Sequence, residues 1–261
     1  GKVQELSKII KAGTAAGRAP RYLVYGRSKQ GKTTFSCTAP NVLVLDPESG
    51  TREGVSSVDV YPIERWQDCD EALRFLRGSD HGYDWIVVDG LTRINQMALK
   101  HVMRLGEEAD LSRIPGMVQL KDYGKAGELM KGMLLSFHTL PHVGVVYTAQ
   151  DRMEAPDLSD DDLLDDDAQI PGARYVPDLP KSVRGAATAM VDCIGRVYSV
   201  SITGAHPKTG KEITQRQYRL WIGQTEQYDT GYRSSHRGIP EYLRKPTVPR
   251  LQELLETGKN N

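Results

Sequence analysis

A glycine-rich stretch near the N-terminus places phosphate-binding side chains at a fixed spacing. Residues 26–33 read GRSKQGKT and fit the template G-x-x-x-x-G-K-[ST]. In this motif the glycines let backbone N–H groups point at phosphate oxygens, the lysine reaches the β- and γ-phosphates, and the hydroxyl binds Mg²⁺. The sequence therefore predicts a nucleoside-triphosphate site with magnesium. The predicted binding residues are Gly26, Arg27, Ser28, Lys29, Gln30, Gly31, Lys32, Thr33 and Thr34.

Three polar residues that follow apolar runs are candidates to complete this site. Asp89 ends the run WIVVD and is, with Thr33, a predicted Mg²⁺ ligand, because Mg²⁺ needs a carboxylate near the phosphates. Glu48 follows NVLVLD and is the candidate to position or deprotonate water. Gln150 ends HVGVVYTAQ and is the candidate to sense the γ-phosphate. The predicted catalytic residues are Glu48, Lys32 and Gln150, although each strand-end residue could also be an ordinary polar loop or cap residue.

The elements that must position these residues follow from the apolar pattern. Short buried runs alternate with helical spacing, which favours an α/β fold with a mostly parallel, doubly wound sheet. The carboxyl ends of parallel strands meet at one rim, where ligands of such sheets bind. Two strand-like runs at 190–202 and 212–223, separated by TGAHPKTGK, predict a hairpin, and 248–257 predicts a final helix stopped by Gly258. We expect an N-terminal helix and linker (1–20), a core (21–203) with a flexible acidic loop (151–189), and a C-terminal hairpin and helix packed on the core (204–261).

Composition and charge narrow the classes of partner. The 261 residues carry 34 basic and 34 acidic side chains, but residues 151–185 hold ten acids and four bases. This segment has a net charge of −6 and the remainder +6, so an anionic partner is not excluded. No apolar run is long enough to cross a membrane, and the N-terminus lacks a signal-peptide core. Three widely spaced cysteines favour a reducing, cytoplasmic location, the host cytoplasm if a phage encodes the chain.

Two common classes of phosphate-loop protein fit poorly. GTP switches carry a guanine-reading [NT]-K-x-D string after a strand, whereas the closest string here, TAQD (148–151), has Ala at the lysine position. Small-molecule kinases close an arginine-rich lid over the nucleotide. The segment after Gln150 is acidic instead and would repel a triphosphate.

The motifs together resemble the RecA family. The segments LDPESG, VVDGLT and TAQDRM are similar to its strand-then-Glu motif, its second nucleotide motif and its Gln-x-Arg-Met switch strand. The resemblance is closest to phage RecA-like ATPases of the single-strand annealing type. It covers roughly residues 20–255 and rests further on LKDYGKAGELM, YVPDLPKSVRG, VDCIGRVY and GYRSSHRGIPEYL.

The resemblance implies a RecA-like core, ATP as ligand, DNA-stimulated hydrolysis, and single-stranded DNA as partner in annealing or strand exchange. It also implies a homo-oligomer, ring or filament, and a single-strand-binding protein is a further partner to consider. A basic residue from the neighbouring subunit would complete the site, with Lys181, Arg184, Arg233 and Arg237 as candidates. Candidate DNA contacts are Arg174, Tyr175, Lys181 and Arg184, with Arg113 and Lys121 in a first loop at 106–121. The family's adenine-stacking aromatic has no counterpart in SGTREGV (49–55).

Two other functions share the same ATP site. One is a hexameric RecA-core DNA helicase, which would unwind duplexes. The other is a nucleotide-dependent assembly or regulatory protein that makes no DNA contact. The aspartate run at 157–167 has two interpretations as well: a solvated loop, or an autoinhibitory flap that competes with DNA for basic residues.

Overall fold

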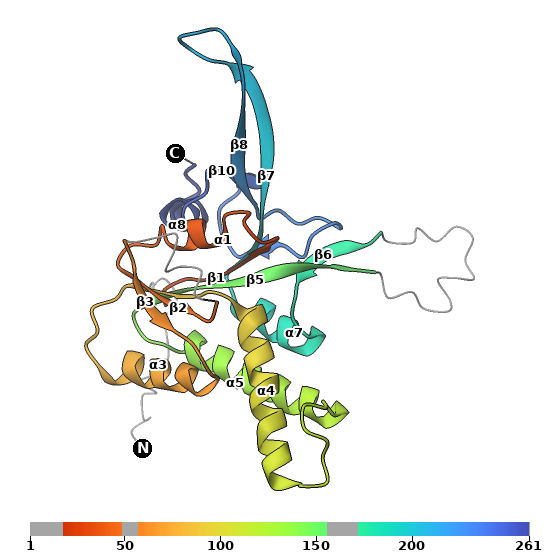
Figure 1. Cartoon of the computed structure of the whole chain (residues 1–261). Helices are drawn as coiled ribbons and strands as arrows, with labels where there is room; N and C mark the ends of the chain where they lie inside the picture. Colours follow the sequence, from red (N-terminus) through yellow and green to blue (C-terminus); the bar gives the residue numbers. More distant parts are fainter. Residues whose placement is uncertain (1–17, 49–56, 156–171, 261) are drawn as a thin grey trace, which may run out of the picture.

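The computed structural model describes residues 18–48, 57–155 and 172–260 (Figure 1). The predicted N-terminal helix, the segment after Glu48 and the aspartate run at 157–167 lie outside the described residues. Among the helices that are described, none is long and apolar enough to span a bilayer.

The described residues form a ten-stranded sheet whose central part is parallel. Its order is β3-β2-β4-β5-β1-β7, so β5 lies between β1 and β4. This confirms the predicted mostly parallel α/β fold. The strands of this part are β1 (Arg21–Gly26), β2 (Val42–Asp46), β3 (Asp59–Pro62), β4 (Trp85–Val88), β5 (Gly144–Glu154) and β7 (Cys193–Ala205).

Helices cover both faces of the sheet (Figure 1). Successive strand residues point to opposite faces, so Leu23 and Tyr25 join one hydrophobic core while Tyr22 and Val24 join the other. The first core is closed by α3 (Gln67–Gly78), α4 (Leu91–Ala109), α5 (Leu120–His138) and α7 (Lys181–Met190). The second is closed by α1 (Lys32–Ser36) and α8 (Val248–Thr257).

The C-terminal strands extend the sheet in antiparallel fashion. Strand β7 starts beside β1 and then continues outward as a long hairpin with β8 (Glu212–Trp221), which Figure 1 shows projecting from the body. The short strands β9 (Gly231–Tyr232) and β10 (Tyr242–Arg244) pair with β7 and β8. The domain boundary predicted between 203 and 204 therefore falls inside β7, because one strand belongs to both the sheet and the hairpin.

The predicted C-terminal helix is confirmed. Helix α8 spans Val248–Thr257, and Gly258 follows it with a φ of 73°, the left-handed conformation that glycine adopts without strain. At the other end, the Thr247 hydroxyl accepts a hydrogen bond from the Arg250 N–H at 3.2 Å.

The range 151–189, predicted as a flexible loop, is regular structure in much of its described part. Strand β5 continues to Glu154 and pairs with β6 (Arg174–Pro177), and α7 follows. The reason is apolar spacing beyond the acidic run: Val176, Leu179 and Val183 are fully buried. Burial of these side chains outweighs the acidic composition of the segment as a whole.

Candidate functional site

The glycine-rich stretch forms a tight loop between β1 and α1. At Gly26 a Cβ atom would lie 2.6 Å from the Val197 carbonyl oxygen, so only glycine fits beside β7. Gly31 has a φ of 95°, and Lys29 is also left-handed at 61°. The backbone reverses through these residues, and α1 begins at Lys32, where Phe35 N–H donates to Gly31 O at 2.9 Å.

Lys32 is buried at the base of this loop. Its ammonium donates to the carbonyl oxygens of Gly26 and Arg27, both at 2.8 Å, and to Gln150 Oε1 at 3.5 Å. Burial lowers the pKa of Lys32, and the negative charge of Asp89 opposes that shift. The Lys32 amine is therefore partly desolvated, and an anion bound beside it would stabilise its protonated, charged form.

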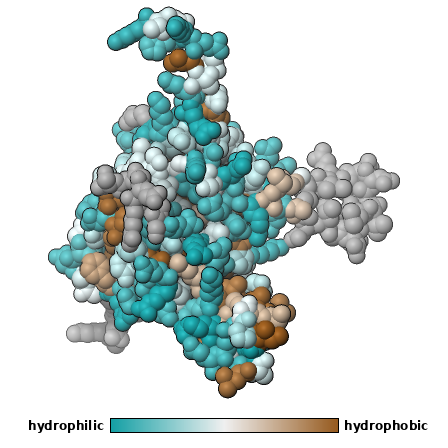
Figure 2. Space-filling model, in the orientation of Figure 1, coloured by the Kyte–Doolittle hydropathy of each residue, from teal (hydrophilic) through white to brown (hydrophobic). Residues whose placement is uncertain are grey.

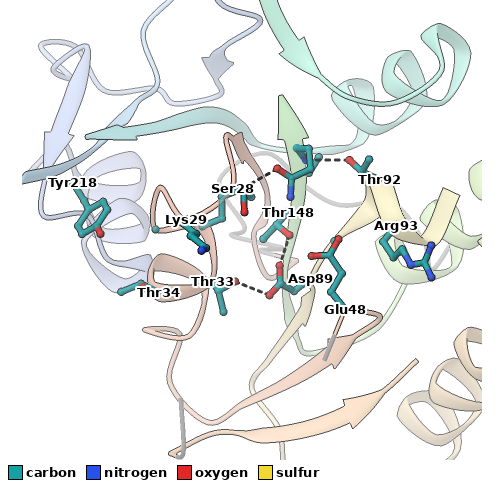
Figure 3. A pocket seen from close by; sticks show the side chains of 15 residues that line it. Ser28, Lys29, Thr33, Thr34, Glu48, Asp89, Thr92, Arg93, Thr148 and Tyr218 are labelled. Atoms are coloured by element: carbon teal, nitrogen blue, oxygen red, sulfur yellow. Dashed lines mark hydrogen bonds between the residues drawn. The ribbon is translucent and has the colours of Figure 1, made fainter. Parts of the chain in front are cut away.

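Asp89 follows β4 and accepts hydrogen bonds from two threonine hydroxyls. Thr33 Oγ1 donates to Oδ2 at 2.8 Å, and Thr148 Oγ1 donates to Oδ1 at 2.6 Å (Figure 3). These oxygen donors suit a hard cation such as Mg²⁺. Nowhere in the described residues do three or more His, Cys, Asp or Glu side chains gather into a metal-binding group. A cation at this point would complete its shell with phosphate oxygens and water, as Mg²⁺ commonly does.

Gln150 lies beside the loop because β5 pairs with β1 in the register Gly26↔Gln150. Its backbone N–H donates to Thr92 Oγ1 at 3.0 Å, and that hydroxyl donates to Asp178 O at 3.0 Å. Asp178 N–H in turn donates to Gln150 O at 2.7 Å. The end of β5 is thus joined to α4 and to the connection between β6 and α7.

Glu48 reaches the same rim from β2. Its N–H donates to the buried Asp46 carboxylate at 2.8 Å, which fixes the turn after the strand. Burial raises the pKa of the Glu48 carboxyl, and the Asp89 charge adds to that shift. Figure 3 shows Glu48 next to Asp89, with Arg93 beyond it.

One cavity collects most of the predicted site residues (Figure 3). The predicted residues that line it are Ser28, Lys29, Gly31, Lys32, Thr33, Thr34, Glu48, Asp89 and Gln150. The lining residues that sequence reasoning missed are Gly90, Thr92, Arg93, Thr148, Ala149 and Tyr218. Of the remaining loop residues, Gly26 and Arg27 contribute the carbonyls that bind Lys32, and Gln30 accepts a hydrogen bond from Ser199 at 2.6 Å.

The basic residues predicted to bind DNA or a neighbouring subunit lie outside this cavity. Arg184 is buried and donates to both carboxylate oxygens of Glu154 at 3.0 Å, so its guanidinium is not free for either role. Tyr175 is half-buried, with the Arg196 guanidinium 4.2 Å from its ring centre. The exposed candidates are Arg174, Lys181, Arg233 and Arg237.

The predicted first DNA loop, 106–121, differs from expectation. Arg113 forms an ion pair with Asp122 at 2.6 Å, and both side chains are almost fully buried. Arg113 is therefore a structural residue and offers no cation to a ligand. The loop instead exposes apolar side chains at Leu111, Ile114, Met117 and Leu120. Lys121 remains exposed beside them. Figure 2 shows brown atoms at the lower end of the molecule, where Figure 1 places the α4–α5 connection.

The parallel sheet, the loop after β1 and the acid after β4 define a P-loop NTPase with an α/β, RecA-like core. The AAA domain family AAA_24 matches residues 18–234, and the chain belongs to this family. No curated protein matches the chain.

Several solved structures show a distant likeness. The flagellar accessory protein FlaH from Methanocaldococcus jannaschii is 9% identical over 88% of both chains, with a TM-score of 0.41. The RadB recombinase is 14% identical over 87% of this chain and 88% of its own, with a TM-score of 0.38. EssC (ATPases 2 and 3) from Geobacillus thermodenitrificans is 13% identical over 77% of this chain and 34% of its own, with a TM-score of 0.30.

Proposed function

We propose that the chain binds ATP with Mg²⁺ in the cavity around Lys32 and hydrolyses it. The observation that carries this proposal is that four segments distant in sequence meet at one cavity: the loop after β1 and the ends of β2, β4 and β5. They bring to it the side chains of Lys32, Glu48, Asp89 and Gln150. Each group has the chemistry that one part of the reaction needs.

The proposed roles follow from the contacts of each side chain. Lys32 would exchange the Gly26 and Arg27 carbonyls for phosphate oxygens. Thr33 and Asp89 would hold Mg²⁺, which neutralises charge on the phosphates when bound. Glu48 would orient and deprotonate the attacking water, and a raised pKa brings a carboxylate closer to the basicity that task needs. Gln150, bonded to Lys32 and Thr92, would report the γ-phosphate to the β6–α7 connection.

The test is ATP binding and hydrolysis by matched variants. Lys32→Ala should abolish turnover and weaken binding, because the phosphates lose their buried cation. Glu48→Gln should bind ATP normally and lose hydrolysis. The exposed residues Lys100 and Glu64 give the controls Lys100→Ala and Glu64→Gln, which should behave as wild type. Normal hydrolysis by Glu48→Gln would remove Glu48 from its role, and normal ATP binding by Lys32→Ala would refute the site.

We also propose single-stranded DNA as the partner of this ATPase, in phage-type recombination by annealing or strand exchange. The support is two exposed arginines on neighbouring strands. Arg152, two residues after Gln150 on β5, is 44% exposed and lies 3.6 Å from the Asp178 carboxylate. Arg174 on the paired strand β6 is 46% exposed and lies 4.0 Å from the Glu154 carboxylate, so both pairs are longer and more exposed than that of Arg184. A DNA backbone bound along the β5–β6 pair would lie close to the end of β5 at Gln150, where the nucleotide site begins.

Turnover measured with and without single-stranded DNA tests this partner. We expect stimulation that falls in Arg152→Ala and Arg174→Ala, while basal turnover is unchanged. Unwinding of a duplex would favour the helicase function instead. Turnover indifferent to DNA would favour an assembly or regulatory protein and refute the DNA proposal without affecting the ATP site.

A further inference from the structure

An apolar groove adjoins the phosphate cavity on its outer side. Its apolar walls come from α1, β7 and β8, in particular Phe35, Val197, Ile202 and Tyr218. Basic residues also line it: Arg216, Arg219 and Lys245. The groove and the phosphate cavity share three lining residues: Gly31, Thr34 and Tyr218. The two spaces therefore meet at the outer edge of the loop, with the Tyr218 ring at the junction.

The positions of the polar groups give a bound nucleotide a direction. Figure 3 shows Tyr218 and Thr34 on one side of Lys29 and Thr33, with Glu48 and Arg93 on the other. If the terminal phosphate points to Glu48 and Gln150, the ribose and base must leave the loop on the Tyr218 side. The base would then enter the apolar groove rather than solvent.

The Tyr218 ring is held in place by the loop that it faces. A Cβ atom at Gly31 would lie 3.0 Å from Tyr218 Cδ1, so the ring packs directly on the Gly31 backbone. Tyr218 pairs across the hairpin with Ser199, whose hydroxyl donates to Gln30 Oε1 at 2.6 Å. Cross-strand partners share a face of the sheet, so neighbouring loop residues contact neighbouring hairpin residues. Loop and hairpin are thus joined at two points, yet 39% of Tyr218 remains exposed.

We propose that Tyr218 is the base-stacking residue of this site and that the groove beside it receives the adenine of ATP. This inference rests on the proposed ATP site. An aromatic ring with a fixed position and an open face suits a flat purine, because stacking needs area and a defined plane. Tyr218, on β8, is the one aromatic residue among the described residues that line the phosphate cavity.

The experiment compares a triphosphate probe that carries a nucleoside with one that carries none. Equilibrium binding of a non-hydrolysable ATP analogue and of inorganic tripolyphosphate, each with Mg²⁺, is measured for wild type, Tyr218→Phe, Tyr218→Leu and Tyr218→Ala. Tyr218→Phe should bind both as wild type. Tyr218→Leu keeps an apolar contact with Gly31 but cannot stack. It and Tyr218→Ala should bind the ATP analogue roughly 5- to 100-fold more weakly and tripolyphosphate unchanged.

The outcomes separate this inference from the ATP site itself. Unchanged affinity for the ATP analogue in Tyr218→Leu and Tyr218→Ala would overturn the stacking role. An equal loss of affinity for both probes would also overturn it, because it would mean that Tyr218 only shapes the phosphate-binding loop. Lys32→Ala should lose both probes, and its failure to do so would refute the phosphate site instead. Tyr232, similarly exposed at 36% on β9, gives the control Tyr232→Ala, which should bind both probes normally.

Discussion

The environment of Glu48 leads to a prediction about pH. Burial raises the pKa of this carboxyl, the Asp89 charge raises it further, and the Arg93 charge lowers it. A general base acts only when deprotonated, so kcat should fall as pH decreases. Because the pKa of Glu48 is raised, the midpoint of this fall should lie above the ordinary pKa of glutamate. Arg93→Gln removes a charge that favours the carboxylate, so it should move this acid limb to still higher pH. The measurement is kcat at saturating MgATP across pH.

An exposed arginine away from the cavity provides the comparison for that experiment. Arg74 lies on α3, outside the cavity. Arg74→Gln should therefore leave the midpoint of the acid limb at its wild-type pH. If Arg93→Gln also leaves it unmoved, the limb belongs to some other group, and Glu48 is not the base that controls turnover.

Single residues of the site were predictable only where a motif or a strand end identified them. Lys32 and Thr33 belong to a spaced motif, and Asp89 ends an apolar run. Thr92 and Thr148 end and begin the segments VVDGLT and TAQDRM, but the resemblance gave neither threonine a role. The role of Thr148 depends on register: the pairing Val88↔Tyr147 brings the next residue, Thr148, against Asp89. Tyr218 is further still from the loop in sequence, and the β7–β8 hairpin brings it there.

At the scale of elements, apolar spacing was a better guide than composition. The spacing of residues 248–257 predicted α8, and the structure confirms both its bounds and the glycine stop. The acidic composition of 151–189 predicted a loop, yet β6 and α7 form there because a few buried side chains fix them. Element bounds that depend on pairing between distant strands, such as the length of β7, could not be predicted from the local sequence alone.

Helix α8 leads to a prediction about stability. Leu254 is fully buried in the core that α8 closes over β1, β2 and β4, so Leu254→Ala leaves a cavity there. We expect a loss of about 2–5 kcal/mol in the free energy of unfolding, measured by urea denaturation. Leu135 is also a helical leucine but is 53% exposed, and Leu135→Ala should cost less than about 1 kcal/mol. Equal losses for the two variants would show that α8 contributes little to this core.

The whole molecule should respond to the nucleotide as one unit, because the site draws on the loop after β1 and on the ends of β2, β4 and β5. Only the folded chain brings these four segments together, so ATP binds the folded state and not the unfolded one. At a free concentration of about 100 times Kd, MgATP should add about 2.7 kcal/mol to the free energy of unfolding. For a chain of this size that raises Tm by roughly 5–11 °C, measured by thermal unfolding.

The same measurement distinguishes specific binding from a general salt effect. Lys32→Ala binds MgATP more weakly and should show a much smaller rise in Tm, whereas the Tm of Lys100→Ala should rise as that of wild type does. Glu48→Gln should rise fully, and it should hold that rise over time because the bound ATP is not consumed. A rise in Lys32→Ala equal to that of wild type would mean that the stabilising ligand binds elsewhere on the molecule, and the cavity beneath the loop would lose its assignment as the nucleotide site.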